Sequence, residues 1–301
     1  MSILEGLCQI LGEQNVKENE PMKKHTTFRV GGPADYFVTP ESASQVQDTI
    51  IFLKENEVPY YIVGNGSNLL VGDRGYRGVI IQIYQKMNQI RTQGEYIYAE
   101  AGALLSKIAA EALAQELTGF EFASGIPGTL GGAVMMNAGA YGGEIKQVVQ
   151  EATVLTPAGE LAKLTVDEME LAYRSSVFSK NGDIVLSAVL KFEKGDKEAI
   201  RARMDELKEQ RITKQPLEYP SAGSTFKRPE GYFAGKLIQD AGLRGFQVGG
   251  AQVSEKHCGF VINKENATAA DIVSLMEQVS DKVEAKFGVC LEPEVKRLGE
   301  F

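Results

Sequence analysis

Residues 125–143 read GIPGTLGGAVMMNAGAYGG, and they constrain the fold more than any other stretch of the chain. Seven of these nineteen residues are glycines, so the backbone here can approach a neighbouring surface closely. A flexible linker should be polar and featureless, whereas this stretch carries large apolar residues with the spacing of a buried helix that begins near Gly128. These residues are Ile126, Leu130, Val134, Met135 and Met136. We therefore predict a packed element that lies against something large and flat.

A second glycine-rich turn, VGNGSNLL at residues 63–70, follows a predicted buried strand. Such a turn can aim several backbone N–H groups at one point and bind phosphate oxygens without cationic side chains. An ordinary tight turn has a similar composition, and neither a G-x-G-x-x-G nor a Walker A sequence is present. Two such stretches near strand ends indicate one extended ligand with a pyrophosphate and a flat ring. A flavin dinucleotide fits that description.

Hydrophobic periodicity predicts a mixed α+β chain. Helices are expected at 42–56, with Ser42 as N-cap, and at 104–116, 196–214 and 268–288. Strands are expected at 59–64, 78–83, 96–101, 149–156, 183–192 and 291–299. The pattern changes after the charged helix at 196–214. We therefore expect one domain over residues 1–195, with subdomains of about 1–80 and 81–195, and a second over 200–301.

Composition excludes several classes of function. The net charge is −8, which disfavours nucleic acid and anionic membranes as partners because both need clustered cations. The three cysteines form no C-x-x-C pair, and His257 next to Cys258 lacks the paired spacing of a zinc site, so we expect neither a disulfide scaffold nor a metal. The first residues lack the basic region of a signal peptide, so we expect none, and no apolar run approaches about 20 residues. We expect a cytoplasmic protein.

Five motifs, taken in chain order, closely resemble those of the UDP-N-acetylenolpyruvoylglucosamine reductases: VGNGSNLL, ASGIPGTLGGAVMMNAGAYG, YRSSVF, AGSTFKRP and LEPEVKRLG. The resemblance runs from about residue 25 to the C-terminus. It implies an FAD-binding fold of the vanillyl-alcohol oxidase/p-cresol methylhydroxylase type, made of two α+β subdomains and followed by an α+β substrate-binding domain. It also implies a role in bacterial peptidoglycan precursor synthesis.

The resemblance implies that both glycine-rich stretches hold FAD. Neither His25 nor His257 lies in the GNGSN loop, where related oxidases often tether the flavin, so we expect non-covalent FAD. The implied cofactor-binding residues are Gly64, Asn65, Gly66, Ser67, Asn68, Leu69, Gly125, Ile126, Pro127, Gly128, Gly132, Asn137 and Gly139.

The family's reaction reduces an enolpyruvyl ether to a lactyl ether, with hydride passing from NADPH to FAD and then to the substrate. The resemblance implies that Ser224 protonates the enolate carbon, that Arg174 holds the carboxylate and that Glu294 stabilises the intermediate. On the residues alone, a serine in such a turn is usually a cap, an arginine in this setting belongs to the surface, and an isolated glutamate forms a strand-edge ion pair.

Weaker candidates for contact with UDP-N-acetylglucosamine enolpyruvate are Tyr173, Lys214, Lys227, Arg228 and His257. The cationic side chains beside the serine turn, Lys214, Lys227 and Arg228, could bind the diphosphate or could simply be solvent-exposed loop residues. The chain lacks the tyrosine-bearing insertion of the larger subtype after YRSSVF, so it resembles the shorter subtype, type II. The sequence therefore does not identify the segment that covers the bound sugar nucleotide. We expect a monomer.

The residues alone leave two alternative functions open. Another FAD-dependent sugar or alcohol oxidase of the same fold would keep both glycine-rich stretches but would not need Ser224, Arg174 and Glu294 together. A nucleotide-sugar binding module without catalysis would lack the flavin. Flavin colour and oxygen reactivity separate the three possibilities.

Overall fold

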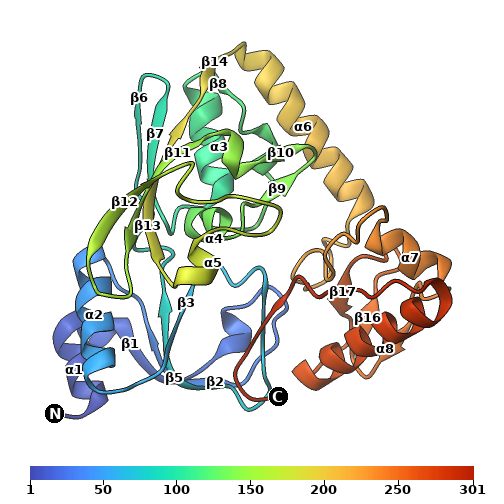
Figure 1. The fold of residues 1–301 in the computed structure, drawn as a ribbon, viewed down its shortest axis with the longest axis horizontal. Coiled ribbons are helices and arrows are strands. Elements are labelled where there is room, and N and C mark those ends of the chain that lie inside the picture. Colours follow the sequence, from blue (N-terminus) through green and yellow to red (C-terminus); the bar gives the residue numbers. More distant parts are fainter. The chain divides into compact units, whose positions relative to one another are not determined.

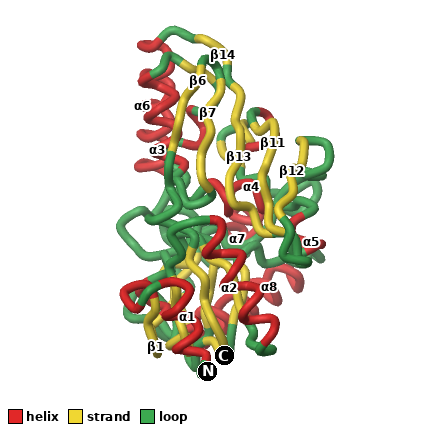
Figure 2. Tube along the Cα trace, turned by 90° about the vertical axis from the view of Figure 1, so that its left-hand side faces the viewer, coloured by secondary structure: helices red, strands yellow, loops and turns green.

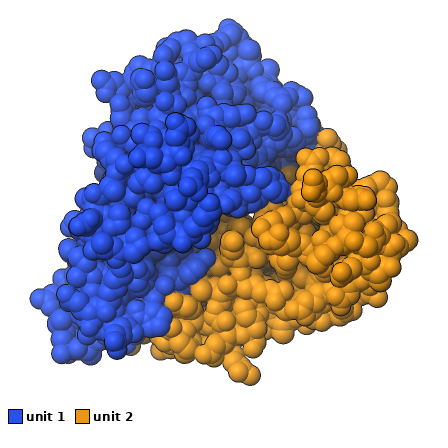
Figure 3. All heavy atoms as spheres, in the orientation of Figure 1, with its two compact units in different colours: residues 1–17, 36–65, 78–211 blue, residues 18–35, 66–77, 212–301 orange.

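The computed structural model describes residues 1–301. The chain forms two compact units, which Figure 3 colours separately. Unit 1 contains residues 1–17, 36–65 and 78–211, and unit 2 contains residues 18–35, 66–77 and 212–301. Each unit is thus assembled from segments that are far apart in the sequence. The boundary expected between residues 195 and 200 stays a prediction. No helix is both long and apolar enough to cross a membrane.

Unit 1 contains a five-stranded antiparallel sheet with the strand order β12-β11-β13-β7-β6 (Figure 2). Helices α3 and α4 pack against β7, and α4 also packs against β13. Alternate residues of the strands are buried, such as Ala152 and Val154 of β11, because one face of the sheet meets the core and the other meets solvent. The elements are β6 (Ile90–Gln93), β7 (Tyr96–Glu100), α3 (Leu105–Ala114), α4 (Leu130–Met135), β11 (Val149–Leu155), β12 (Leu161–Thr165) and β13 (Ile184–Lys191).

A four-stranded sheet has the order β1-β2-β5-β3, in which β3 and β5 are parallel. Helix α2 begins after Ser42, whose hydroxyl accepts a hydrogen bond from Gln45 N at 3.2 Å. Helix α1 begins with a capping box of Ser2 and Glu5, and it packs against α2. The elements are α1 (Ile3–Leu11), β1 (Val16–Pro21), β2 (Pro33–Val38), α2 (Ala43–Glu55), β3 (Tyr60–Val63) and β5 (Tyr76–Gln82).

Unit 2 is built around the long helix α8, labelled in Figure 1, which packs on the three-stranded sheet β15-β16-β17. Its apolar face buries residues that include Ile272, Leu275 and Val279. Strand β18 pairs in parallel with β4, which directly follows the GNGSN loop. The elements are β4 (Leu69–Val71), α7 (Ala234–Asp240), β15 (Gln247–Val248), β16 (Ala251–Val253), β17 (Val261–Asn263), α8 (Ala269–Phe287) and β18 (Lys296–Leu298).

All four expected helices and the central strands are confirmed, with ends that differ by a few residues. The predicted helix near Gly128 is α4, which spans only six residues. The closing strand expected at 291–299 is reduced to β18. The remaining elements are the long helix α6 (Lys197–Lys214) and the short elements β8 (Leu117–Thr118), β9 (Gly139–Ala140), β10 (Gly143–Glu144), α5 (Phe178–Asn181) and β14 (Glu193–Lys194).

Candidate functional site

The start of the first glycine-rich stretch, residues 63–65, lies next to the second stretch in unit 1. Asn65 donates a hydrogen bond from Nδ2 to the carbonyl of Pro127 at 2.6 Å. A Cβ atom on Gly64 would lie 2.2 Å from the hydroxyl oxygen of Thr129, which is buried. This contact leaves no room for a side chain at Gly64. Residues 63–65 are thus adjacent to the second stretch, and the expectation that both stretches serve one ligand stays a prediction.

The part of the GNGSN loop in unit 2 has backbone N–H groups that make no hydrogen bond within the chain. Gly66 has φ +61°, and its carbonyl accepts a hydrogen bond from Thr27 N at 3.2 Å. The backbone N–H groups of Gly66, Ser67 and Asn68 donate no hydrogen bond within the chain. The hydroxyl of Thr27 is buried and has no hydrogen-bond partner. Unpaired donors around one loop are what phosphate oxygens require, so these residues fit the pyrophosphate of FAD.

The glycines of the second stretch differ in what surrounds them. A Cβ on Gly139 would lie 2.7 Å from the carbonyl oxygen of Gly143, so the chain itself needs a glycine there. A Cβ on Gly132 would meet nothing nearer than the Thr129 hydroxyl at 3.7 Å, and Gly132 is exposed. Gly125 and Pro127 are also exposed, and Ile126 and Gly128 are half-buried. Only part of the stretch therefore presents a bare surface that could receive a flat ring.

Asn137 uses its side chain within the chain. Its Nδ2 donates to Glu144 Oε2 at 3.0 Å and to Ala172 O at 3.2 Å, and its Oδ1 accepts from Lys146 N at 2.9 Å. Both amide protons are thereby occupied. A contact of Asn137 with FAD would have to come from its backbone or from the remaining lone pair of Oδ1.

Arg174 lies in unit 1 on a tight hairpin. Ala172 and Ser175 exchange two backbone hydrogen bonds of 3.0 and 3.1 Å, which leaves Tyr173 and Arg174 at the tip. The guanidinium carbon of Arg174 lies 5.3 Å from the centre of the Tyr173 ring, and Nη2 donates to Gly139 O at 3.4 Å. The predicted carboxylate holder is thus beside the end of the second glycine-rich stretch. Tyr173 is 54% exposed, so its ring is open to a ligand.

Unit 2 brings Ser224 and Glu294 onto neighbouring segments. Glu294 N donates to the carbonyl of Thr225 at 2.8 Å, and Phe226 forms a bridge with Pro293. The serine is exposed, whereas only 9% of Glu294 is exposed. An accessible hydroxyl on a segment paired with that of a buried glutamate is compatible with delivery of a proton to a bound substrate.

The GNGSN loop contacts this pair of segments. Asn68 Nδ2 donates to the carbonyl of Glu294 at 3.2 Å, and Lys296 N donates to Asn68 O at 3.0 Å. Thr225 is fully buried, and its hydroxyl accepts from Val261 N at 2.9 Å. The serine turn, the glutamate and the end of the predicted phosphate loop are therefore held together by the backbone.

Four of the five weaker substrate candidates lie in unit 2, in different settings, and Tyr173 lies in unit 1. Lys227 pairs with Glu292, and the guanidinium carbon of Arg228 lies 3.9 Å from the centre of the Phe233 ring. Lys214 is the last residue of α6 and is exposed. His257 is half-buried, and burial chiefly lowers its pKa. Its Nδ1 accepts a hydrogen bond from Gly259 N at 3.1 Å, which requires that nitrogen to be unprotonated.

Comparison with known proteins decides the family. A model described as UDP-N-acetylenolpyruvoylglucosamine reductase, C-terminal domain, matches residues 215–298, and one described as FAD binding domain matches residues 34–165. The UDP-N-acetylenolpyruvoylglucosamine reductase of Clostridium botulinum is 55% identical over 288 residues, which cover 96% of this chain and 94% of the relative. That of Agathobacter rectalis is 53% identical over 312 residues, which cover 100% and 99%. The chain belongs to the UDP-N-acetylenolpyruvoylglucosamine reductase family.

The structural comparison agrees. The crystal structure of a UDP-N-acetylenolpyruvylglucosamine reductase from Thermus caldophilus superposes with a TM-score of 0.81 at 34% identity, covering 93% of this chain and 98% of that one. A variant of Phl p 4, described as a glucose oxidase, shares the fold alone, with a TM-score of 0.51 at 14% identity over 65% of this chain and 45% of that one. The predicted α+β class with an FAD-binding fold is confirmed.

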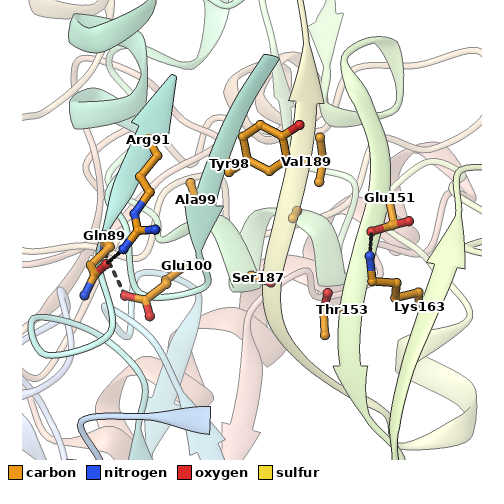
Figure 4. Close-up of a pocket in the computed structure, with 11 residues that line it drawn as sticks. Gln89, Arg91, Tyr98, Ala99, Glu100, Glu151, Thr153, Lys163, Ser187 and Val189 are labelled. Carbon is orange, nitrogen blue, oxygen red and sulfur yellow. Dashed lines mark hydrogen bonds and ion pairs between the residues drawn. The ribbon is translucent and has the colours of Figure 1, made fainter. Parts of the chain in front are cut away.

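A cavity in unit 1 contains none of the predicted site residues. It has a volume of about 340 Å³ and lies on the outer face of the five-stranded sheet, where side chains of β6, β7, β11, β12 and β13 meet (Figure 4). Lys163 forms an ion pair with Glu151 at 2.8 Å. Gln89 accepts a hydrogen bond from Arg91 and donates its backbone N–H to Glu100. Because none of the family's motif residues lines this cavity, we do not assign the site of the reductase family there.

Sequence reasoning missed two residues that support the glycine-rich stretches. Arg211 of α6 donates to the carbonyl of Gly125, and its guanidinium carbon lies 6.0 Å from the centre of the Tyr141 ring. Burial lowers the pKa of Arg211. Thr129 packs against Gly64. Arg211 belongs to a helix whose many charges indicate a solvated face. Its position near the end of that helix is the one sequence feature that could have indicated a contact with another segment.

Proposed function

We propose that this chain reduces the enolpyruvyl ether of UDP-N-acetylglucosamine enolpyruvate to the lactyl ether of UDP-N-acetylmuramate, with NADPH as the electron donor and non-covalent FAD as the cofactor. This places it in bacterial peptidoglycan precursor synthesis. We further propose that it acts as a monomer in the cytoplasm. Family membership supports the substrate, because the relatives carry this substrate in their name.

The observation that carries the proposal is the pairing of the Ser224 turn with the Glu294 segment in unit 2. The two segments are joined by the hydrogen bond from Glu294 N to Thr225 O at 2.8 Å. An oxidase that passes electrons to oxygen needs no proton donor on a serine turn. A reductase that protonates a carbon does need one.

When bound, FAD supplies a two-electron carrier between NADPH and the substrate. The protein binds the substrate, stabilises the negative charge that develops on it and donates the proton that completes the reaction. The guanidinium of Arg174 pairs with the substrate carboxylate through two parallel N–H bonds, a geometry that arginine favours. As hydride reaches the terminal carbon, negative charge moves onto the adjacent carbon and the carboxylate, and fixed donors lower the free energy of that state.

The proton comes from Ser224. Its Oγ–H protonates the carbon that bears the ether oxygen, which completes the lactyl group, and the hydroxyl is then reprotonated from solvent. Ser224 is exposed in the structure and can exchange with water before the substrate enters. Glu294, when protonated, can donate a hydrogen bond to the substrate carboxylate and offset its growing charge.

Ser224→Ala tests the assignment of the proton donor. We expect NADPH to bleach the flavin at the wild-type rate, while recolouring by the enolpyruvyl substrate slows by about 10²–10⁴-fold, the usual contribution of a general acid. Anaerobic stopped-flow absorbance at the flavin band measures both half-reactions separately. Equal rates of recolouring in the variant and the wild type would show that another group delivers the proton.

A further inference from the structure

The hairpin that carries Arg174 is held in a conformation that an arginine rarely adopts. Its φ is +52°, in the left-handed region that favours glycine. Such a residue persists only where the surrounding contacts determine it. The two hydrogen bonds between Ala172 and Ser175 close the hairpin, but they do not fix where it points.

Asn137 binds this hairpin from the second glycine-rich stretch. It is 1% exposed and has φ +44°, a conformation that asparagine tolerates better than most residues. Its Nδ2 donates to the carbonyl of Ala172 at 3.2 Å and to Glu144 at 3.0 Å. The base of the hairpin is therefore tied to the strand pair β9 and β10, and Gly139 of β9 accepts from Arg174.

Ser176 binds the same two segments on the other side of Arg174. It is 0% exposed, and its hydroxyl donates to the carbonyl of Met135 at 2.5 Å. Two buried side chains thus join residues 135–137 to residues 172–176, one on each side of the strained arginine. Buried hydrogen bonds are costly to leave unmade, so this pair fixes the direction of the hairpin.

We infer that Asn137 and Ser176 are positioning residues that aim the Arg174 guanidinium at the substrate carboxylate. The inference rests on the proposed function and extends it, because it gives Asn137 a role toward the substrate in place of a side-chain contact with FAD. It predicts that both residues affect the binding of the enolpyruvyl substrate through Arg174 alone.

The test uses Asn137→Gly, Ser176→Ala and Arg174→Ala, together with the two double variants that contain Arg174→Ala. Glycine tolerates the left-handed φ of residue 137, so this change removes the side chain without adding backbone strain. Ser176→Ala removes one oxygen atom and keeps the test open where Asn137→Gly fails to fold. Asn15→Ala is the matched control, because Asn15 is 2% exposed and its amide also bonds within unit 1, to Leu11 O at 2.8 Å.

Three quantities are measured on the flavin-loaded proteins. They are the Kd of the enolpyruvyl substrate, from the change in flavin absorbance on binding, the rate of bleaching by NADPH, and the Tm. We expect Asn137→Gly and Ser176→Ala each to raise the Kd about tenfold, and Ser176→Ala to leave the bleaching rate unchanged. We expect neither change to raise the Kd further once Arg174→Ala is present. Asn15→Ala should lower the Tm and leave the Kd unchanged.

The outcomes separate this inference from the function on which it rests. A wild-type protein that does not bind or respond to the enolpyruvyl substrate would overturn both. A wild-type protein that responds, with double variants whose losses multiply, would overturn the positioning role alone. A bleaching rate that falls in parallel with substrate affinity would also overturn it, because that result indicates damage to the flavin site.

Discussion

Single glycines in the two stretches serve different purposes. A Cβ on Gly66 would lie 2.1 Å from the carbonyl oxygen of His25, so the chain requires glycine there with or without a ligand. At Gly132 the space is open. The sequence shows that glycines cluster in these stretches. It does not show which glycine is required by close packing within the chain and which leaves an open surface for a ligand, because the residue type is the same in both cases. Only the neighbours contributed by distant segments distinguish them.

Gly132→Ala tests whether the cofactor lies against the open part of the stretch. Residue 132 is exposed within helix α4, so alanine should stabilise the flavin-free protein by about 0.4–1 kcal/mol. The added methyl group should at the same time weaken FAD binding, because it occupies the surface offered to the ring. Urea unfolding of the flavin-free protein and a fluorescence titration with FAD measure the two effects.

Gly66→Ala is the comparison for this prediction. Its φ of +61° and the contact with His25 should make alanine destabilising in the flavin-free protein as well. Gain of stability without loss of FAD affinity in Gly132→Ala would place the ring elsewhere.

At the scale of elements, the N-terminus of α8 is fixed by a carboxylate from far along the chain. Asp73 accepts from Ala269 N at 2.8 Å and from Ala270 N at 3.0 Å, and Thr268 adds its own cap. A negative charge at a helix N-terminus is favourable, and the bonds satisfy two N–H groups that the helix leaves free. Asp73 follows β4, so the cap also anchors the segment that leaves the GNGSN loop.

Asp73→Ala should lower the free energy of unfolding by about 1–2 kcal/mol, the usual cost of losing a cap and a dipole contact. It should also weaken FAD binding, because residues 66–77 lose an anchor. Asp281→Ala is the matched control, since Asp281 is exposed on the same helix, and its effect should stay within about 0.5 kcal/mol. Chemical unfolding of both variants checks the stability, and equal losses in the two would refute the capping role.

The turn at His257 predicts a pH dependence of stability. Burial lowers the pKa of His257 in the folded protein below its usual value, so the unfolded chain binds the proton more readily. Stability from this group is complete above about pH 6.5 and is lost as the pH falls below it toward the folded pKa. Unfolding free energies at pH 7.5 and 5.5 should therefore differ more in the wild type than in His257→Asn. The other histidine, His25, is present in both the wild type and the variant. If the unfolding free energy changes equally between the two pH values in both proteins, the prediction is contradicted.

Periodic elements were the predictable ones. Helices α2, α3, α6 and α8 were found because their apolar spacing is set by local sequence. Strand β4 has three residues and was missed, because its existence depends on pairing with β18 more than two hundred residues later. Short strands of this kind carry too few residues for a pattern, and long-range pairing alone defines them.

At the scale of the whole molecule, the second core draws on distant segments. Phe28, Val30 and Leu70 pack in the same buried cluster as α8, although they come from residues 18–35 and 66–77. No local pattern marks these three residues as part of that core, so the sequence predicts candidate site residues in unit 2 but not the segments that support their fold. Ser224 and Glu294 were predictable through their motifs, whereas the backbone contact of Asn68 with Glu294 was not.

The central claim is that this chain moves electrons from NADPH to an enolpyruvyl ether. The direct measurement is anaerobic stopped-flow absorbance of the FAD-loaded wild type, first with NADPH and then with UDP-N-acetylglucosamine enolpyruvate. We predict bleaching of the flavin band by NADPH and rapid recolouring by the second compound. Bleaching that is followed by recolouring only when oxygen is admitted would contradict the claim and favour an oxidase.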